Sequence, residues 1–258
     1  MISLVNSFIL RSVQNKCSKY KNQNMINGQH TTDTTTNSDT NTKNKKIENQ
    51  HIYAILDRSA SMSGKTENVL KGLRQQVDEL KNDKTCSIFI SVKIFDTEQS
   101  TIMDTKNVKN ITENDFEVLK ETYIPRYNTA IKDALGDSLV YLIDTQMSEK
   151  KYEDVVIYLF TDGKENASVN INYTGDKLKD LIQKSEKEHN IKVLYVGSNQ
   201  DSIVNANNLG ISYDKAMDYN ETFEGVNGTY RALSDAIRRS RSNEPIGFTY
   251  IERTRSML

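Results

Sequence analysis

Apolar residues after position 50 recur in two alternating patterns. Short apolar runs predict buried strands over residues 52–56, 87–95, 154–160 and 192–196, with 100–103 as a short antiparallel neighbour of the second run. Apolar residues spaced three or four apart predict helices in the regions 69–80, 130–147, 178–182 and 221–241. This alternation predicts an α/β fold, doubly wound, with a mainly parallel central sheet and helices on both faces.

The first 50 residues differ in composition from the rest of the chain. Ile47 is the single large aliphatic residue in 28–50, so this polar stretch buries too little apolar surface to offset the entropy of ordering. A targeting peptide is an alternative interpretation of the start, because no acidic residue precedes Asp33. We expect a disordered arm over residues 1–50, a folded domain over 51–243 and a C-terminal extension over 244–258.

The overall charge restricts the kinds of partner. The 34 Lys and Arg residues nearly balance the 35 Asp and Glu residues, which argues against a broad nucleic-acid-binding surface. No stretch approaches the roughly 20 apolar residues that span a bilayer, so we expect no membrane partner. Cys17 and Cys86 lie in different surroundings, which argues against a disulfide. We therefore expect a monomer in a reducing intracellular compartment, the cytoplasm.

Oxygen-bearing side chains follow two of the predicted strands. Asp57, Ser59 and Ser61 come directly after the first strand, and Asp162 follows the strand 154–160. In a parallel α/β sheet, ligands bind outside the carboxyl ends of the strands. Carboxylate and hydroxyl oxygens suit Mg²⁺, and two carboxylates balance its charge. Because the hydroxyl ligands are neutral, the ion stays electron-poor and should attract a further carboxylate from outside. Mn²⁺ suits the same oxygen ligands.

These segments resemble the metal-ion-dependent adhesion site of von Willebrand factor A domains. The resemblance rests on the order and spacing of three motifs between about residues 51 and 241: Asp57-x-Ser59-x-Ser61, Thr129 before a helix, and Thr161-Asp162-Gly163. It implies that Ser59, Ser61 and Thr129 are metal ligands and that Asp57 and Asp162 contact the metal directly or through water. It also implies that an Asp or Glu of a partner protein completes the metal's ligand shell.

The loops around the predicted metal site depart from the family pattern. Ala60 stands where the family usually has Gly, and Tyr127-Asn128 replaces the small residues that commonly precede the threonine. Asn128 tolerates left-handed backbone, which preserves the turn. We expect the partner to contact these loops through Arg58, Tyr127, Asn128 and Gly163.

Other interpretations of the same residues remain. Asp57, Thr129 and Asp162-Gly163, each taken alone, are consistent with helix caps or tight turns. Ser59–Thr66 comes within one residue of a phosphate-binding loop, so a nucleotide-binding switch is an alternative. A metal-dependent phosphohydrolase, in which the cation activates water, is another. The three histidines, His30, His51 and His189, form no recognisable catalytic group. We therefore predict no catalytic residues and a binding protein rather than an enzyme.

Overall fold

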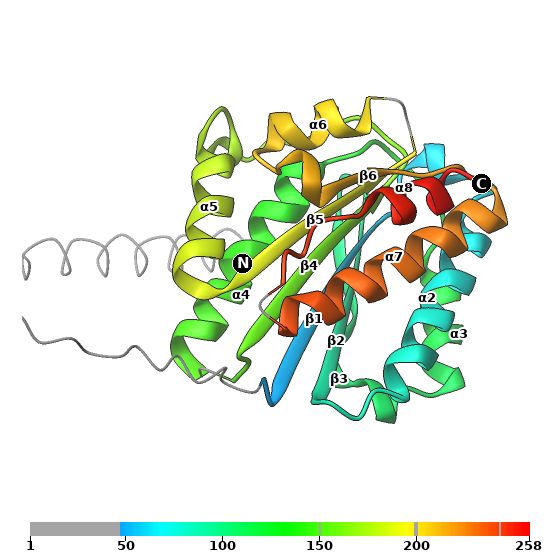
Figure 1. Ribbon diagram of the computed structural model, residues 1–258. Coiled ribbons are helices and arrows are strands. Elements are labelled where there is room, and N and C mark those ends of the chain that lie inside the picture. The colour runs from blue at the N-terminus through cyan, green and yellow to red at the C-terminus, as the bar shows by residue number, and fades with distance from the viewer. Residues whose placement is uncertain (1–46, 150, 199–200, 243) are drawn as a thin grey trace, which may run out of the picture. The chain divides into compact units, whose positions relative to one another are not determined.

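The computed structural model describes residues 47–149, 151–198, 201–242 and 244–258 (Figure 1). These residues belong to one compact unit. The predicted disordered arm therefore lies outside the described residues, except for its last four. Two of these, Asn49 and Gln50, already belong to the first strand.

A six-stranded sheet forms the centre of the described unit. Its strands are β1 (Asn49–Asp57), β2 (Ser87–Phe95), β3 (Gln99–Asn107), β4 (Asp154–Thr161), β5 (Ile191–Gly197) and β6 (Ala216–Asp218), in the order β3-β2-β1-β4-β5-β6. All neighbours pair in parallel except β3, which runs antiparallel to β2. The predicted mainly parallel sheet is confirmed, and the predicted neighbour at 100–103 is part of the longer β3.

Helices cover both faces of the sheet, as predicted (Figure 1). The apolar sides of α2 (Thr66–Lys81), α3 (Glu113–Thr122) and α7 (Phe223–Arg241) share one core with one face of the sheet. Those of α4 (Ile131–Glu149), α5 (Lys177–His189) and α6 (Ser202–Leu209) share a second core with the opposite face. The short helix α8 (Tyr250–Ser256) packs against α7.

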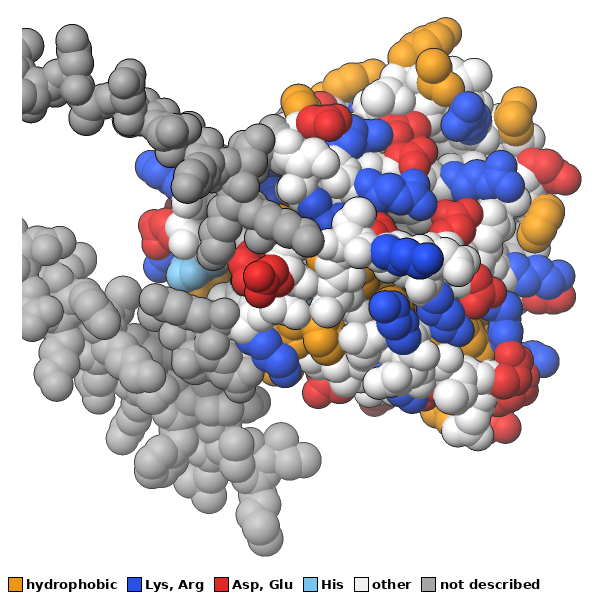
Figure 2. Space-filling model, turned by 60° about the horizontal axis from the view of Figure 1, so that its bottom comes forward, with side chains coloured by type: hydrophobic (Ala, Val, Ile, Leu, Met, Phe, Trp, Pro, Cys, Tyr) orange, Lys and Arg blue, Asp and Glu red, His pale blue; other side chains and the backbone are white. Residues whose placement is uncertain are grey.

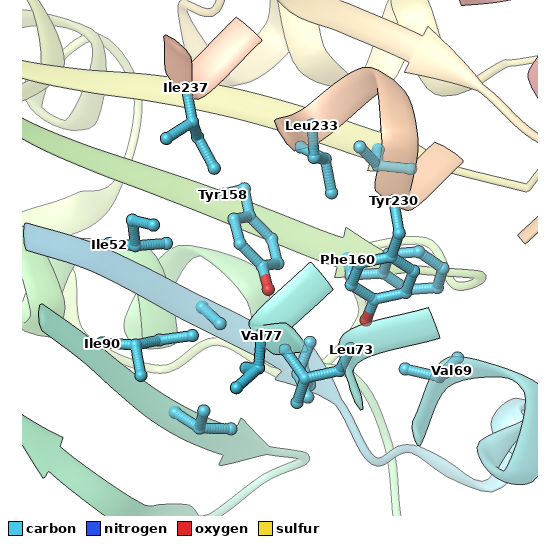
Figure 3. Close-up of a cluster of buried hydrophobic side chains, with 14 of the residues drawn as sticks. Ile52, Val69, Leu73, Val77, Ile90, Tyr158, Phe160, Tyr230, Leu233 and Ile237 are labelled. Carbon is cyan, nitrogen blue, oxygen red and sulfur yellow. The ribbon is translucent and has the colours of Figure 1, made fainter. Parts of the chain in front are cut away.

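Aromatic rings lie among aliphatic side chains in the core between β4 and α7 (Figure 3). The Phe160 and Tyr230 rings stack with centroids 5.5 Å apart, and Tyr158 meets Tyr230 edge to face. A Cβ atom added at Gly72 of α2 would lie 2.2 Å from the Tyr230 ring, so the two helices approach closely only because this residue is glycine. This packing joins β4 to α7, and the loop after β4 carries Asp162.

Three α-helices and one strand were absent from the sequence prediction. The pattern did not predict α3, α6, β6 or the helical turn of α8, all of which are short. Short elements carry little periodicity of their own, and their packing against the larger sheet and α7 stabilises them.

Opposite charges are interspersed on the surface in Figure 2. The arginines at the end of α7 are likewise each paired with a carboxylate. Arg238 pairs with Asp235, Arg239 with Glu252 and Arg241 with Asp83. Among the described helices, none combines the length and apolar character needed to cross a bilayer.

Candidate metal centre

The two predicted carboxylates lie at the carboxyl edge of the sheet on neighbouring strands. Asp57 ends β1, and Asp162 follows the last residue of β4. The register of this pair places Leu56 beside Phe160. The loops that begin with Asp57 and Asp162 therefore leave the sheet side by side, where ligands bind in this class of fold.

Asp57 is a buried carboxylate that accepts hydrogen bonds with both oxygens. Its Oδ1 accepts from the Ser59 backbone N–H at 2.6 Å, and its Oδ2 accepts from Thr161 Oγ1 at 2.5 Å. Tyr123 donates its hydroxyl proton to the Asp57 backbone carbonyl at 2.7 Å. Burial raises the pKa of Asp57 to about 6, because the charged form is desolvated. A cation beside this carboxylate would compensate that cost.

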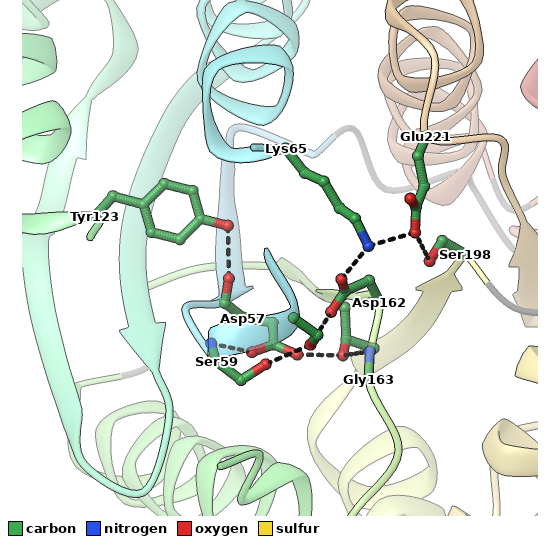
Figure 4. A network of polar contacts seen from close by, with 10 residues as sticks. Asp57, Ser59, Lys65, Tyr123, Asp162, Gly163, Ser198 and Glu221 are labelled. Carbon is green, nitrogen blue, oxygen red and sulfur yellow. Dashed lines mark hydrogen bonds and ion pairs between the residues drawn. The ribbon is translucent and has the colours of Figure 1, made fainter. Parts of the chain in front are cut away.

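A chain of hydroxyl groups joins the first loop to the second (Figure 4). The Oγ atoms of Ser59 and Ser61 lie 3.0 Å apart, and Ser61 Oγ donates to Asp162 Oδ1 at 2.6 Å. Ser59 is buried and Ser61 is exposed, so the oxygen cluster reaches the surface at Ser61.

Thr129 brings a third loop to the same place. Its backbone N–H donates to Asn166 Oδ1 at 2.8 Å, and its carbonyl accepts from the Asn166 N–H at 3.1 Å. A Cβ atom added at Gly163 would lie 2.9 Å from Thr129 Oγ1 and 3.4 Å from Asp57 Oδ2. The structure thus gathers all five predicted ligand residues, Asp57, Ser59, Ser61, Thr129 and Asp162, into one cluster.

Gly163 provides a test of this close approach. We expect Gly163→Ala to weaken divalent-metal binding by at least about tenfold, roughly 1.4 kcal/mol, because the new methyl group displaces the Thr129 hydroxyl. The fold should survive, because Gly163 does not have the positive φ angle that alanine disfavours. Mn²⁺ titration followed by the electron paramagnetic resonance of free Mn²⁺ measures the change. Gly175→Ala is the control for a general loss of stability: a Cβ there would meet nothing within 4 Å, but the φ of 58° disfavours alanine, so this variant should lose stability and keep its Mn²⁺ affinity.

Asp96, a residue that the sequence prediction missed, ties the loops together. It is buried after the end of β2 and accepts from Arg58 Nε at 2.8 Å and from Arg126 Nε at 3.0 Å. Its backbone carbonyl accepts from the Ala130 N–H at 3.1 Å. Asp96 therefore connects the Asp57 loop to the Thr129 loop. The sequence did contain a signal for Asp96: it follows the predicted strand 87–95 by one residue, and this places it at the same sheet edge as Asp57.

The residues predicted to contact a partner have different exposures. Arg58 is 5% exposed and lies beneath the loops, bonded to Asp96. Tyr127 is 56% exposed, with the Arg126 guanidinium 4.8 Å from its ring centre, and Asn128 is exposed as well. The left-handed residue of this turn is Tyr127, with φ of 59°, and not Asn128 as expected. The Tyr127 carbonyl accepts from the Ala60 N–H at 3.1 Å, a long-range contact that holds this conformation.

The segment that resembles a phosphate-binding loop has a different geometry. A 3-10 turn occupies Ala60–Met62, and α2 begins at Thr66. The N–H groups of Met62, Ser63 and Lys65 donate to carbonyls within the segment, so they do not form a cradle for phosphate. Lys65 instead pairs with Asp162 and Glu221. Burial alone would lower the pKa of Lys65, but its hydrogen bonds to these carboxylates outweigh burial and raise it.

The two described histidines lie away from the cluster. His51 precedes Asp57 by six positions in β1, about 20 Å along an extended strand. His189 ends α5 just before β5 begins, at the opposite edge of the sheet from Asp57. Neither provides a base for the hydroxyls of the cluster.

Comparisons with known proteins identify the family of the chain. The sequence profile of the von Willebrand factor type A domain matches residues 51–230, and the chain belongs to this family. A comparison with curated proteins finds no match.

Solved structures share the fold at low sequence identity. The PilB minor pilin of Streptococcus sanguinis has a TM-score of 0.56 at 13% identity, over 77% of this chain and 63% of the pilin. Proximal thread matrix protein 1 of the mussel byssus has a TM-score of 0.52 at 14% identity, over 76% of this chain and 46% of that protein. A von Willebrand factor type A protein of Catenulispora acidiphila has a TM-score of 0.51 at 15% identity, over 74% and 43%. The chain thus spans less than two thirds of each of these proteins.

Proposed function

We propose that this protein is a protein-binding module that depends on a divalent cation, Mg²⁺ or Mn²⁺. The observation that supports it best is the gathering of five oxygen-bearing side chains from three loops at the carboxyl edge of the sheet. The chemistry of this set fits a hard cation, because it contains carboxylates and hydroxyls but neither imidazole nor thiolate.

Each residue of the cluster has a definite part in the proposal. Asp57 and Asp162 would balance the charge of the ion, and Ser59, Ser61 and Thr129 would supply neutral oxygens. When bound, the ion would supply an electrophilic centre for an Asp or Glu of the partner. Asp96 and Arg58 would hold the loops in place.

The surface beside the cluster supports a protein partner. Tyr127 and the nearby Ile124 are both more than half exposed on the loop that leads to Thr129. Exposed aromatic side chains beside polar groups are typical of protein-binding surfaces, because they bury large area at low conformational cost. The acidic residue of the partner would bind at the ion, and apolar groups beside it would cover Tyr127.

Selection of random peptides on the full-length protein tests this function. Phage-displayed peptides bound in Mg²⁺ and released by EDTA should share an Asp or Glu at one fixed position. The Ser59→Ala/Ser61→Ala variant should bind none of them, because it lacks two hydroxyl ligands. Peptides that remain bound in EDTA, or that bind the variant equally well, would refute the proposal. The nucleotide alternative predicts binding of ATP that Lys65→Ala removes.

A further inference from the structure

Lys65 places a positive charge directly on the proposed metal site. It precedes α2, and its ammonium contacts Asp162 Oδ2 and lies 2.5 Å from Glu221 Oε1 (Figure 4). Its side chain is 23% exposed, and the carboxylate of Asp162 is fully buried. One ammonium is therefore shared between a proposed metal ligand and a second carboxylate.

Glu221 belongs to a segment that other parts of the chain hold in place. Its Oε1 also accepts from Ser198 Oγ at 2.8 Å. The N–H of the preceding residue, Asn220, donates to the carbonyl of Ser256 at the end of α8 at 2.8 Å. The following residue, Thr222, caps α7 by accepting from the Gly225 N–H at 3.0 Å. Glu221 is thus positioned to hold the Lys65 ammonium whether or not Asp162 does.

We propose that Lys65 is an internal counter-cation that competes with the divalent ion for Asp162, and that Glu221 limits this competition by holding the same ammonium. The proposal rests on the proposed function, because it takes Asp162 as a metal ligand. The physical reason is that two cations at one carboxylate repel each other, strongly where the carboxylate is buried. Lys65 would turn wholly to Glu221 when the ion binds.

Opposite effects of two substitutions test the competition. Lys65→Met should tighten Mn²⁺ binding to the full-length protein by at least about tenfold, or about 1.4 kcal/mol. Glu221→Gln should weaken it, because the ammonium then pairs with Asp162 alone. In the Lys65→Met background, Glu221→Gln should have little effect, since there is no ammonium left to release. If the effects of the two substitutions do not add, they act through the contact that Lys65 and Glu221 share; a general change in charge would give additive effects.

Two control variants keep the comparison specific. Lys164→Met removes the same charge from a lysine two positions after Asp162, whose ammonium pairs with Asp201 at 2.8 Å. We expect it to change Mn²⁺ affinity far less than Lys65→Met does. Lys65→Arg keeps the charge and should bind Mn²⁺ much as the wild type does. Thermal melting without metal checks that every variant is folded.

The outcomes distinguish the two proposals. If the wild type binds Mn²⁺ through Asp57 but Lys65→Met binds equally or more weakly, the competition is wrong and the metal site stands. If neither the wild type nor Lys65→Met binds Mn²⁺, both proposals fail. If only Lys65→Met binds, and Asp57→Asn abolishes that binding, both are supported.

Discussion

Mg²⁺ should raise the melting temperature of the wild-type protein, and Asp57→Asn should abolish this rise. An ion that binds only the folded state stabilises it by about 2.7 kcal/mol when present at a hundred times its dissociation constant. For a domain of about 200 residues, this corresponds to a rise of roughly 5–10 °C. Asp57→Asn removes the charge that attracts the ion but keeps an acceptor for the Ser59 N–H. Scanning calorimetry of the full chain in Mg²⁺ and in EDTA measures the difference.

A distant carboxylate provides the control for this experiment. Asp176 precedes α5, its side chain is 85% exposed, and it pairs with Lys179 at 3.4 Å. Asp176→Asn should therefore keep the full Mg²⁺-dependent rise. An equal rise in wild type and Asp57→Asn would contradict the assignment of Asp57 as a ligand.

Acid should destabilise the protein through His51, with an effect of about 3 kcal/mol between pH 7.5 and pH 4. Burial lowers the pKa of His51 from 6.5 to about 4, because the charged ring is desolvated. Below pH 6.5 the unfolded chain takes up a proton at this residue, whereas the folded protein does so only near pH 4. The free energy of unfolding therefore falls as the pH falls through this window, by about 1.4 kcal/mol for each pKa unit.

The measurement is urea unfolding across this pH range for wild type and His51→Gln. The comparison with His51→Gln is needed because Asp57 changes the free energy of unfolding in the opposite direction as the pH falls. Burial raises its pKa to about 6, so the folded protein takes up that proton first and gains stability as the pH falls. The difference between the two proteins isolates His51, and a difference that stays constant from pH 7.5 to pH 4 would refute the prediction.

The sequence alone determined the order of the main elements and the composition of the candidate site. Apolar runs and helical spacing are local properties, so they predicted four parallel strands and the helices between them. The rule that ligands bind at the carboxyl ends of parallel strands then directed attention to Asp57 and Asp162. The resemblance to the family motif implied that Ser59, Ser61 and Thr129 are ligands as well, and the structure places these five residues together.

Only the tertiary structure decided how the loops around this site are held. Arg58 is buried because Asp96, directly after the neighbouring strand β2, accepts a hydrogen bond from its guanidinium. Tyr127 adopts a left-handed backbone that its own side chain disfavours, and its carbonyl binds the Ala60 N–H. Lys65 meets Glu221 across 156 positions of sequence. Such contacts depend on which strands are neighbours and on where each side chain points, and neither is encoded in the periodicity of a short segment.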